Sequence, residues 1–525
     1  MVALLMLVPQ SNAIASSEDE TVEREKIQWI ERWIEDGMKS TALPGMSVVI
    51  VENGLVVYNK GFGVKNRKGD PVSTSTAFPL ASVSKTMTAM LILQTSSEGL
   101  IRLDDRVVDY LPDFRTRNVD LSDQITIRHL LNQTSGFSGY VGNLHQDDTA
   151  RRTDALQIAM ARLRDVTLER APGSKFEYSN VNFDILGLVL ETIRNSQFEE
   201  IAKQGIFAPL GMNDSFILAP EGPVQDVSER FRYWGRWPAY YDRRLGRGLV
   251  ASGAAFSSSD DMGKYLIELT NDNPKIFPVA QREDMLTAHG GASGIVYAKG
   301  WFIDNSGADT LAYHDGSLAG ATSLIGFVPE RRIGFAILAN SSIGLLSGDT
   351  RGIEAGIVDI LLDRPLREIG SPPLYQFIFW GLVVLLLALV TWLILFVRAW
   401  LGGRLKATTL MLLGPAFLLT VLVPALLYSA PLAFGSSLPS LAEFLPDIAL
   451  FISLGAAVAA LLAALRIAVW LKQRLAEKGE RKWGHDRPRS VLLGFCQQLD
   501  SKAAQGSLWK RHDPIRLFNV LFGPH

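Results

Sequence analysis

The sequence predicts an α+β domain with one mostly antiparallel sheet flanked by helices plus an all-helical region, followed by three transmembrane helices. The first observation is the order of patterns within residues 22–365, where a hairpin is followed by helices, then by strands and a closing helix. The second is a set of long apolar runs after residue 373. With 47% hydrophobic and 20% charged residues, the composition excludes a disordered chain.

The predicted domain begins with a helix and a hairpin. Residues 21–34 carry apolar side chains at helical spacing. The apolar segments 46–51 and 55–58 then flank Asn53-Gly54, the strongest short-range hairpin signal. Further helices are expected at 82–93, 125–131, 181–195, 198–208 and 260–269, strands at 310–314, 323–328 and 334–339, and a closing helix at 352–362.

The N-terminus has the pattern of an exported protein. Residues 1–8 are apolar, and Ala13-Ile14-Ala15 fits a small-residue cleavage site. No basic residue precedes the apolar run, so the pattern corresponds to the back half of a signal peptide. Residues 1–15 are therefore expected to be the remnant of one.

The C-terminal part is expected to be embedded in a membrane. The runs 375–397, 409–430 and 448–465 approach or exceed the roughly 20 apolar residues that cross a bilayer. None of them contains a charged residue before Arg466. We therefore expect three transmembrane helices within residues 374–471.

Basic residues predict the orientation of these helices, because cytoplasmic loops are enriched in Lys and Arg. The first connection holds Arg398, Arg404 and Lys406, whereas the second, around 435–446, holds no Lys or Arg. From Arg466 onward there are 12 Lys and Arg against 5 Asp and Glu. The basic tail, residues 472–525, is thus expected in the cytoplasm, and the domain at 22–365 outside the cell membrane.

Composition also narrows the function classes. The chain before Arg466 is acidic overall, which argues against nucleic acid as a partner. The single cysteine, Cys496, excludes an intrachain disulfide. Because CxxC and HExxH motifs are missing from the sequence, zinc catalysis lacks its usual signature, and no metal or cofactor is expected.

The segment Ser82-Val-Ser-Lys85 places a serine and a lysine three residues apart at a predicted helix start. Positions i and i+3 share a helix face, so the lysine amine lies beside the serine hydroxyl. A serine becomes nucleophilic when a base takes its proton, and lysine is such a base if burial keeps it neutral. Alone the motif is weak, because Ser507-Leu-Trp-Lys510 also fits it and a helix-capping serine is the simpler interpretation.

A second candidate element is Tyr178-Ser-Asn180. In an extended segment, positions i and i+2 point the same way, so the phenol and the amide face one cleft. Tyrosine titrates near about 10, and a neighbouring cationic lysine makes its anion accessible for proton transfer. The alternative is a loop tyrosine before a helix that Asn180 caps.

The third element is His314-Asp-Gly316-Ser317 on a predicted strand. His314 and Gly316 share a face, and glycine permits the close approach of a substrate backbone. The backbone N–H of Ser317 would form an oxyanion hole with that of Ser82. The alternative is an ordinary strand histidine.

Taken in order, these three elements resemble those of the serine β-lactamase and penicillin-binding protein superfamily. The resemblance is greatest to class C β-lactamases and their esterase, D-aminopeptidase and D,D-peptidase relatives. It covers about residues 22–362 and includes the connecting segments 125–136 and 248–253. It implies a β-lactamase/transpeptidase-like fold, with Ser82 as acylated nucleophile, Lys85 and Tyr178 as a general-base pair, and Asn180, His314, Gly316 and Ser317 as substrate-binding residues.

One position departs from the family pattern. Members that bind penicillin carboxylates usually carry lysine where His314 stands, and histidine is mostly neutral near pH 7. We therefore expect a membrane-anchored extracytoplasmic serine hydrolase for D-amino-acid peptides, esters or β-lactam-like amides, with efficient β-lactam hydrolysis the least favoured. The alternatives are a non-catalytic or slow-turnover ectodomain that binds such molecules, and an accessory ectodomain on a functional three-helix unit. The sequence predicts no oligomeric state.

Overall fold

The computed structural model describes residues 11–143, 149–218, 226–235, 237–287, 294–342, 348–366, 373–405, 408–429 and 437–483. It divides into two compact units, Met1–Trp392 with Val423–Ala457, and Leu393–Leu422 with Val458–His525. Residues 1–10 and 484–525, which hold most of the predicted signal-peptide remnant and of the predicted tail, lie outside the described residues. Both assignments stay predictions.

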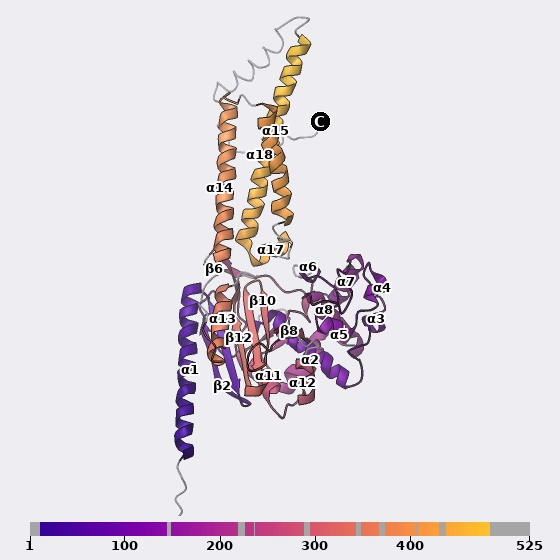
Figure 1. Cartoon of the computed structure of the whole chain (residues 1–525), viewed down its shortest axis with the longest axis vertical. Coiled ribbons are helices and arrows are strands. Elements are labelled where there is room, and N and C mark those ends of the chain that lie inside the picture. Colours follow the sequence, from indigo (N-terminus) through magenta and orange to yellow (C-terminus); the bar gives the residue numbers. More distant parts are fainter. Residues whose placement is uncertain are drawn as a thin grey trace, which may run out of the picture. The chain divides into compact units, whose positions relative to one another are not determined.

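The first unit is built on an antiparallel sheet that has seven strands among the described residues (Figure 1). From one edge to the other these are β2 (Leu55–Gly63), β1 (Gly45–Glu52), β12 (Ile333–Ala339), β11 (Ala321–Val328), β10 (Leu311–Leu318), β9 (Trp301–Asp304) and β8 (Ile295–Ala298). The predicted hairpin forms β2 and β1, with Asn53 and Gly54 in its turn at positive φ angles of 49° and 77°. The α+β class is thereby confirmed.

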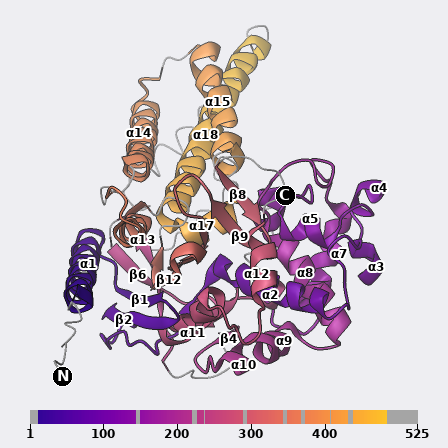
Figure 2. The same ribbon diagram turned by 60° about the horizontal axis from the view of Figure 1, so that its bottom comes forward.

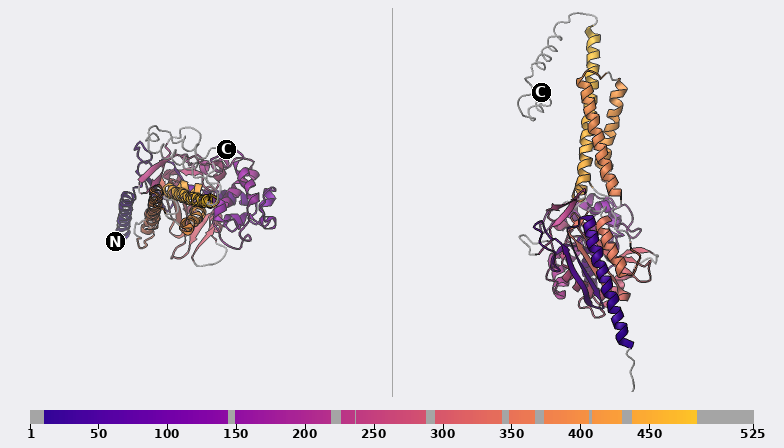
Figure 3. Two further views of the ribbon diagram at one scale, coloured as in Figure 1. Left: turned by 90° about the horizontal axis from the view of Figure 1, so that it is seen from above. Right: turned by 90° about the vertical axis from the view of Figure 1, so that its left-hand side faces the viewer.

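Two helices from opposite ends of the domain cover one face of the sheet. Helix α1 (Ser11–Thr41) and α13 (Gly348–Leu361) lie side by side there, as the right-hand view of Figure 3 shows. Ile34 of α1 and Ile357 of α13 are fully buried against Met46 of β1. The helical periodicity predicted for residues 21–34 explains this contact, because the apolar stripe of an amphipathic helix is buried against the sheet.

The other face carries the larger core and the all-helical region (Figure 2). Helix α11 (Ser259–Thr270) packs directly on β1 and β12. The remaining helices are α2 (Ser84–Ser97), α3 (Val107–Tyr110), α4 (Val119–Ser122), α5 (Ile127–Leu131), α6 (Gly139–Asn143), α7 (Ala155–Ala161), α8 (Asn180–Arg194), α9 (Phe198–Ala202), α10 (Ala208–Leu210) and α12 (Val279–Leu286). Helices α2 and α8 pack on each other within this layer.

Several strands were not predicted from the sequence. Strands β8 and β9 have four residues each, too short for an alternating pattern to stand out. Hairpin β5 (Arg230–Trp234) and β6 (Trp237–Tyr241) mixes arginines with aromatics and joins β13 (Ser341–Ser342) in a small second sheet. A third small sheet contains β3 (Phe78–Pro79), β7 (Ala255–Ser257) and β4 (Phe216–Ile217).

Three long apolar helices follow the domain: α14 (Pro373–Leu401), α15 (Thr409–Pro424) and α18 (Pro446–Trp483). Their apolar stretches, Tyr375–Leu401, Thr409–Ser429 and Pro446–Ala476, are long and apolar enough to cross a membrane by length and composition. The short helix α17 (Leu438–Phe444) and the first turns of α18 belong to the first unit.

Candidate active site

Ser82 lies in a tight turn between the sheet and the helical layer. It is half-buried in a single 3₁₀ turn (Ala81–Val83) that leads directly into α2. Ala81 has a φ of 48°, a left-handed conformation that a residue with a side chain rarely adopts. The Ser323 hydroxyl of β11 donates to the Leu80 carbonyl at 2.6 Å, so the sheet holds this strained turn in place.

The Lys85 amine sits directly behind Ser82 and is fully buried. Its Nζ lies 3.1 Å from Ser82 Oγ, 2.8 Å from Asn180 Oδ1 and 2.7 Å from the Ser252 carbonyl oxygen. Burial lowers the pKa of Lys85 to about 7, although the Asp184 carboxyl opposes the shift. The amine is therefore neutral in a large fraction of molecules near neutral pH.

The partners of Lys85 determine where its lone pair points. Asn180 Oδ1 and the Ser252 carbonyl can only accept hydrogen bonds. A neutral amine has two hydrogens and one lone pair, so these two acceptors take both hydrogens. The lone pair is left for the Ser82 hydroxyl, which is the geometry of a general base.

Tyr178 contacts the same serine from the other side of the site. Its ring centroid lies 5.1 Å from Lys85 Nζ, and the Ser82 hydroxyl is close enough to the phenol to lower its pKa slightly. Burial raises the pKa of Tyr178 far above its ordinary value. Burial therefore disfavours the tyrosine anion expected from the sequence, because the cost of desolvating the anion outweighs the lowering effect of the Ser82 hydroxyl. Tyr178 stays a phenol that can give a proton.

Asn180 is held at both ends of its amide. It opens α8, its Oδ1 accepts from Lys85, and its Nδ2 donates to Asn143 Oδ1 of α6 at 3.2 Å. The amide plane is thus fixed, and two hydrogen bonds through Lys85 connect it to the Ser82 hydroxyl. Asn180 is the first residue of α8, one residue before the helix start predicted from the sequence.

His314 of β10 is buried and neutral. Its Nδ1 lies 2.7 Å from the Asp315 carbonyl, which only accepts, so Nδ1 carries the proton. Nε2 then accepts from the Tyr297 hydroxyl at 3.2 Å. Burial lowers the pKa of His314 to about 4, so the ring offers no positive charge near pH 7.

Gly316 of β10 lies where the protein has no room for a side chain. A Cβ there would lie 2.4 Å from the Leu80 carbonyl oxygen and 2.4 Å from Ser323 Oγ. The sequence suggested a close approach of a substrate backbone, which stays a prediction; the structure shows a close approach of the strand to the turn that carries Ser82. The glycine therefore sets the distance between β10 and this turn.

Ser317 lies on an open edge of β10. Strand β9 pairs with β10 only from Leu311 to Tyr313, so the edge beyond it is uncovered by β9. A two-residue turn joins β10 to β11, so the Leu318–Ala321 pair next to it is hydrogen-bonded. Because successive residues of a strand direct their N–H groups to opposite sides, the Ser317 N–H points away from β11. Strand β10 also contacts the turn that carries Ser82.

The comparisons with known proteins identify the family. Residues 30–355 match the family model described as Beta-lactamase. The chain belongs to this beta-lactamase family. Over 316 residues it is 27% identical to Protein flp of Staphylococcus aureus, a match that covers 60% of this chain and 63% of that protein. It is 30% identical to penicillin-binding protein 4 of Amycolatopsis lactamdurans over 195 residues, 37% of this chain and 49% of that protein.

Solved structures agree with the beta-lactamase-like fold. The octameric penicillin-binding protein homologue from Pyrococcus abyssi matches with a TM-score of 0.56 and 27% identity, over 67% of this chain and 80% of that chain. EstCE1, a hydrolase with promiscuous acyltransferase activity, gives 0.57 at 19% identity, over 65% and 99%. A class C beta-lactamase gives 0.55 at 19% identity, over 65% and 96%. The last two show the fold alone.

Two residues of this beta-lactamase-family site were missed from the sequence. Asp184, one helical turn beyond Asn180, is 2% exposed and lies close enough to Lys85 for each charge to shift the pKa of the other. Burial raises the pKa of Asp184 to about 7. An acidic residue inside the apolar run of α8 was the available signal, because a buried carboxyl needs a partner.

Gln133 supports Tyr178 from behind. It is fully buried with a φ of 57°, and its Oε1 accepts from the Ser179 backbone N–H at 3.0 Å. The same oxygen accepts from Asn182 Nδ2 of α8 at 2.5 Å. Its position inside the family-like segment 125–136 gave no indication of this role, because the contact spans 46 residues of sequence.

Proposed function

We propose that this beta-lactamase-family protein is a membrane-anchored, extracytoplasmic serine hydrolase that works through an acyl-enzyme on Ser82. The observation that carries the proposal is the Lys85 amine, buried 3.1 Å from Ser82 Oγ with its pKa lowered to about 7. A serine with such a neighbour is activated for attack, because the base is already in place and partly unprotonated.

The residues divide the reaction between them. Lys85 takes the Ser82 proton as Oγ attacks the substrate carbonyl carbon. The backbone N–H groups of Ser82 and Ser317 donate to the oxyanion that forms. Tyr178, a phenol beside Ser82, gives a proton to the leaving group and recovers one from Lys85. Water then attacks the acyl-enzyme carbonyl carbon while Lys85 takes its proton. Lys85 returns this proton to Ser82 Oγ as the bond from Oγ to the carbonyl carbon breaks and the acid product leaves.

The neutral state of His314 favours substrates that do not depend on a carboxylate clamp. With both ring nitrogens bonded to the protein and a pKa of about 4, His314 supplies no cation at neutral pH. D-amino-acid peptides and esters are therefore favoured over β-lactams, whose carboxylate would find no partner at this position.

The three apolar helices support the membrane anchor. Their apolar stretches have the length that a bilayer requires, and the basic residues of the first connection and the tail favour the cytoplasmic side. The catalytic domain would then lie outside the cell membrane and the basic tail in the cytoplasm.

The test is acylation of the full chain in detergent by a fluorescent penicillin, p-nitrophenyl esters and D-peptides, followed by mass spectrometry. Labelling at Ser82 is expected, and Ser82→Ala should abolish both labelling and hydrolysis. Ser507→Ala, in the other S-x-x-K segment, is the matched control and should behave as wild type. Labelling elsewhere in Ser82→Ala would overturn the assignment. A permanent adduct without product release would favour the slow-turnover binding protein.

A further inference from the structure

The tip of the β5–β6 hairpin exposes two tryptophans. Trp237 is 74% exposed and Trp234 39% exposed, at opposite sides of the turn. Exposed single apolar residues are common on soluble domains and need no special reason. The question is what the rest of the hairpin contacts.

The hairpin tip is tied to the first turns of two apolar helices. The Gly235 N–H donates to Asp447 Oδ2 at 2.7 Å, and the Tyr375 hydroxyl donates to the same oxygen at 2.5 Å. Tyr375 opens the apolar stretch of α14, and Asp447 is the second residue of α18. Both side chains are 2% exposed. The tip is therefore fixed at the level where both apolar stretches begin.

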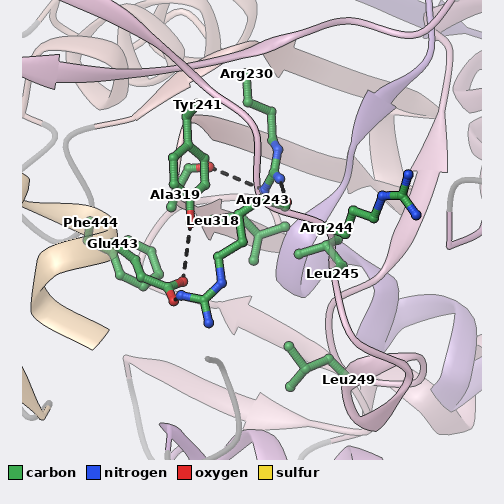
Figure 4. Close-up of a pocket in the computed structure, with 10 residues that line it drawn as sticks. All are labelled: Arg230, Tyr241, Arg243, Arg244, Leu245, Leu249, Leu318, Ala319, Glu443 and Phe444. Carbon is green, nitrogen blue, oxygen red and sulfur yellow. Dashed lines mark hydrogen bonds and ion pairs between the residues drawn. The ribbon is translucent and has the colours of Figure 1, made fainter. Parts of the chain in front are cut away.

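The segment before α18 closes on the same hairpin. Arg232 Nη1 donates to the Ala442 carbonyl of α17 at 3.0 Å, and Glu443 forms an ion pair with Arg243, which Figure 4 shows. The pocket in this seam has a volume of about 20 Å³, room for one water molecule. The contact between the β5–β6 hairpin and α17 is therefore closely packed, and all of it lies in the first unit.

These contacts place the two tryptophans at the same depth as the beginnings of the apolar stretches of α14 and α18. An aromatic ring with an N–H group prefers the boundary between lipid tails and headgroups, where the ring is buried and the N–H stays hydrated. Trp234 and Trp237 flank Gly235, the residue tied to both helix starts. Arg244, exposed beside the same seam, matches the negative charge of lipid phosphates.

We propose that the β5–β6 tip is an interfacial anchor, with Trp234 and Trp237 inserted among the headgroups of the outer leaflet. The occupant of this surface is lipid. The inference rests on the proposed function, because it needs the apolar helices to be in a bilayer.

The anchor also restrains the site. The Phe231 N–H of β5 donates to the Asn340 carbonyl at 2.9 Å and lies 3.3 Å from the Gly320 carbonyl. Gly320 belongs to the turn that follows Ser317 on β10. A tip held in the headgroups thus holds this end of β10 at a fixed height above the bilayer.

The experiment measures depth with single-cysteine probes in the full chain. In a Cys496→Ser background, Trp237→Cys, Leu55→Cys and Val384→Cys are each labelled with a nitrobenzoxadiazole fluorophore and reconstituted into phosphatidylcholine/phosphatidylglycerol vesicles containing brominated lipid. Leu55, 69% exposed beside the turn of the β1–β2 hairpin, is the matched control. Val384, 64% exposed in α14, reports the membrane itself.

The probe at position 384 should be strongly quenched and the probe at position 55 should not be quenched. The probe at position 237 should lie between them and lose at least half of its fluorescence. Quenching at 384 together with equal signals at 237 and 55 would overturn the anchor and leave the membrane helices intact. A blue-shifted but unquenched probe at 237 would indicate a protein cover and would also overturn it. No quenching at 384 would remove the membrane proposal and the anchor with it.

Discussion

Two lysines of the beta-lactamase-family domain, Lys85 and Lys299, are both fully buried, yet their surroundings differ. Lys299 Nζ forms an ion pair with Asp284 Oδ2 at 2.9 Å, and that carboxylate is 53% exposed on its side chain. Lys85 Nζ instead contacts a hydroxyl, an amide oxygen and a backbone carbonyl. Both pKa values are lowered by burial.

The difference lies in what compensates the buried charge. The Asp284 carboxylate at contact distance stabilises the ammonium form of Lys299 and opposes the effect of burial on its pKa. Dipoles alone compensate burial only in part, which leaves the pKa of Lys85 at about 7 and the amine available as a base. The Asp184 carboxyl, which raises the pKa of Lys85, has its own pKa raised to about 7 and so carries only part of a charge. The contrast predicts that a buried lysine can serve as a base where its hydrogen-bond partners are neutral.

The sharpest test exchanges each lysine for methionine. Lys85→Met should lower the acylation rate on the order of 10³-fold, the typical contribution of a general base. Lys299→Met should leave that rate within about twofold, because its amine does not contact the site. Acylation of the two full-length variants by a p-nitrophenyl ester, followed by stopped flow, decides this. If both variants lost the same share of the acylation rate, the two lysines would differ in no catalytic role, and both losses would reflect reduced stability.

The pH profile of wild type tests the neutral amine directly. Protonated Lys85 cannot accept the Ser82 proton, so kcat/KM should fall as pH decreases through about 7. Below the midpoint the loss is about tenfold per pH unit. Rates for an uncharged ester between pH 5 and 9 measure it. A flat profile across pH 6–8 would contradict an amine that titrates there.

Removing the carboxyl behind Lys85 should move this midpoint. Asp184 raises the pKa of Lys85, so Asp184→Asn should shift the acid limb to lower pH and raise the relative rate at pH 6 by up to about tenfold. Asp284→Asn, which removes the partner of Lys299, is the matched control and should leave the midpoint in place. A midpoint displaced to higher pH in Asp184→Asn would reverse the assigned sign.

The smallest expected effect concerns stability. The pKa of Lys85 falls from 10.5 to about 7 on folding, so between these values the unfolded chain holds a proton that the folded chain lacks. Stability of wild type relative to Lys85→Met should therefore rise from pH 7 to pH 10. Thermal unfolding of both proteins, followed by circular dichroism across this range, gives the difference in Tm. A pH-independent difference would mean that Lys85 is charged in the folded protein.

The sequence by itself determined the local elements and the family. Asn53-Gly54 formed the predicted hairpin turn, the apolar periodicity of residues 21–34 formed part of α1, and the family match confirmed the resemblance based on the three motifs. These features depend on contacts between near neighbours, or on residue types in order, and both can be recognised along a chain. The three apolar runs became long helices for the same reason.

Only the tertiary structure decided the chemistry of the site. Whether Lys85 is a base and Tyr178 a phenol depends on burial and on partners such as Ser252, which lies 167 residues away. The reason for Gly316 also appears only when β10 meets the turn of Ser82. A pKa or a close approach is set by what surrounds a group in space, and long-range packing supplies surroundings that no local pattern encodes.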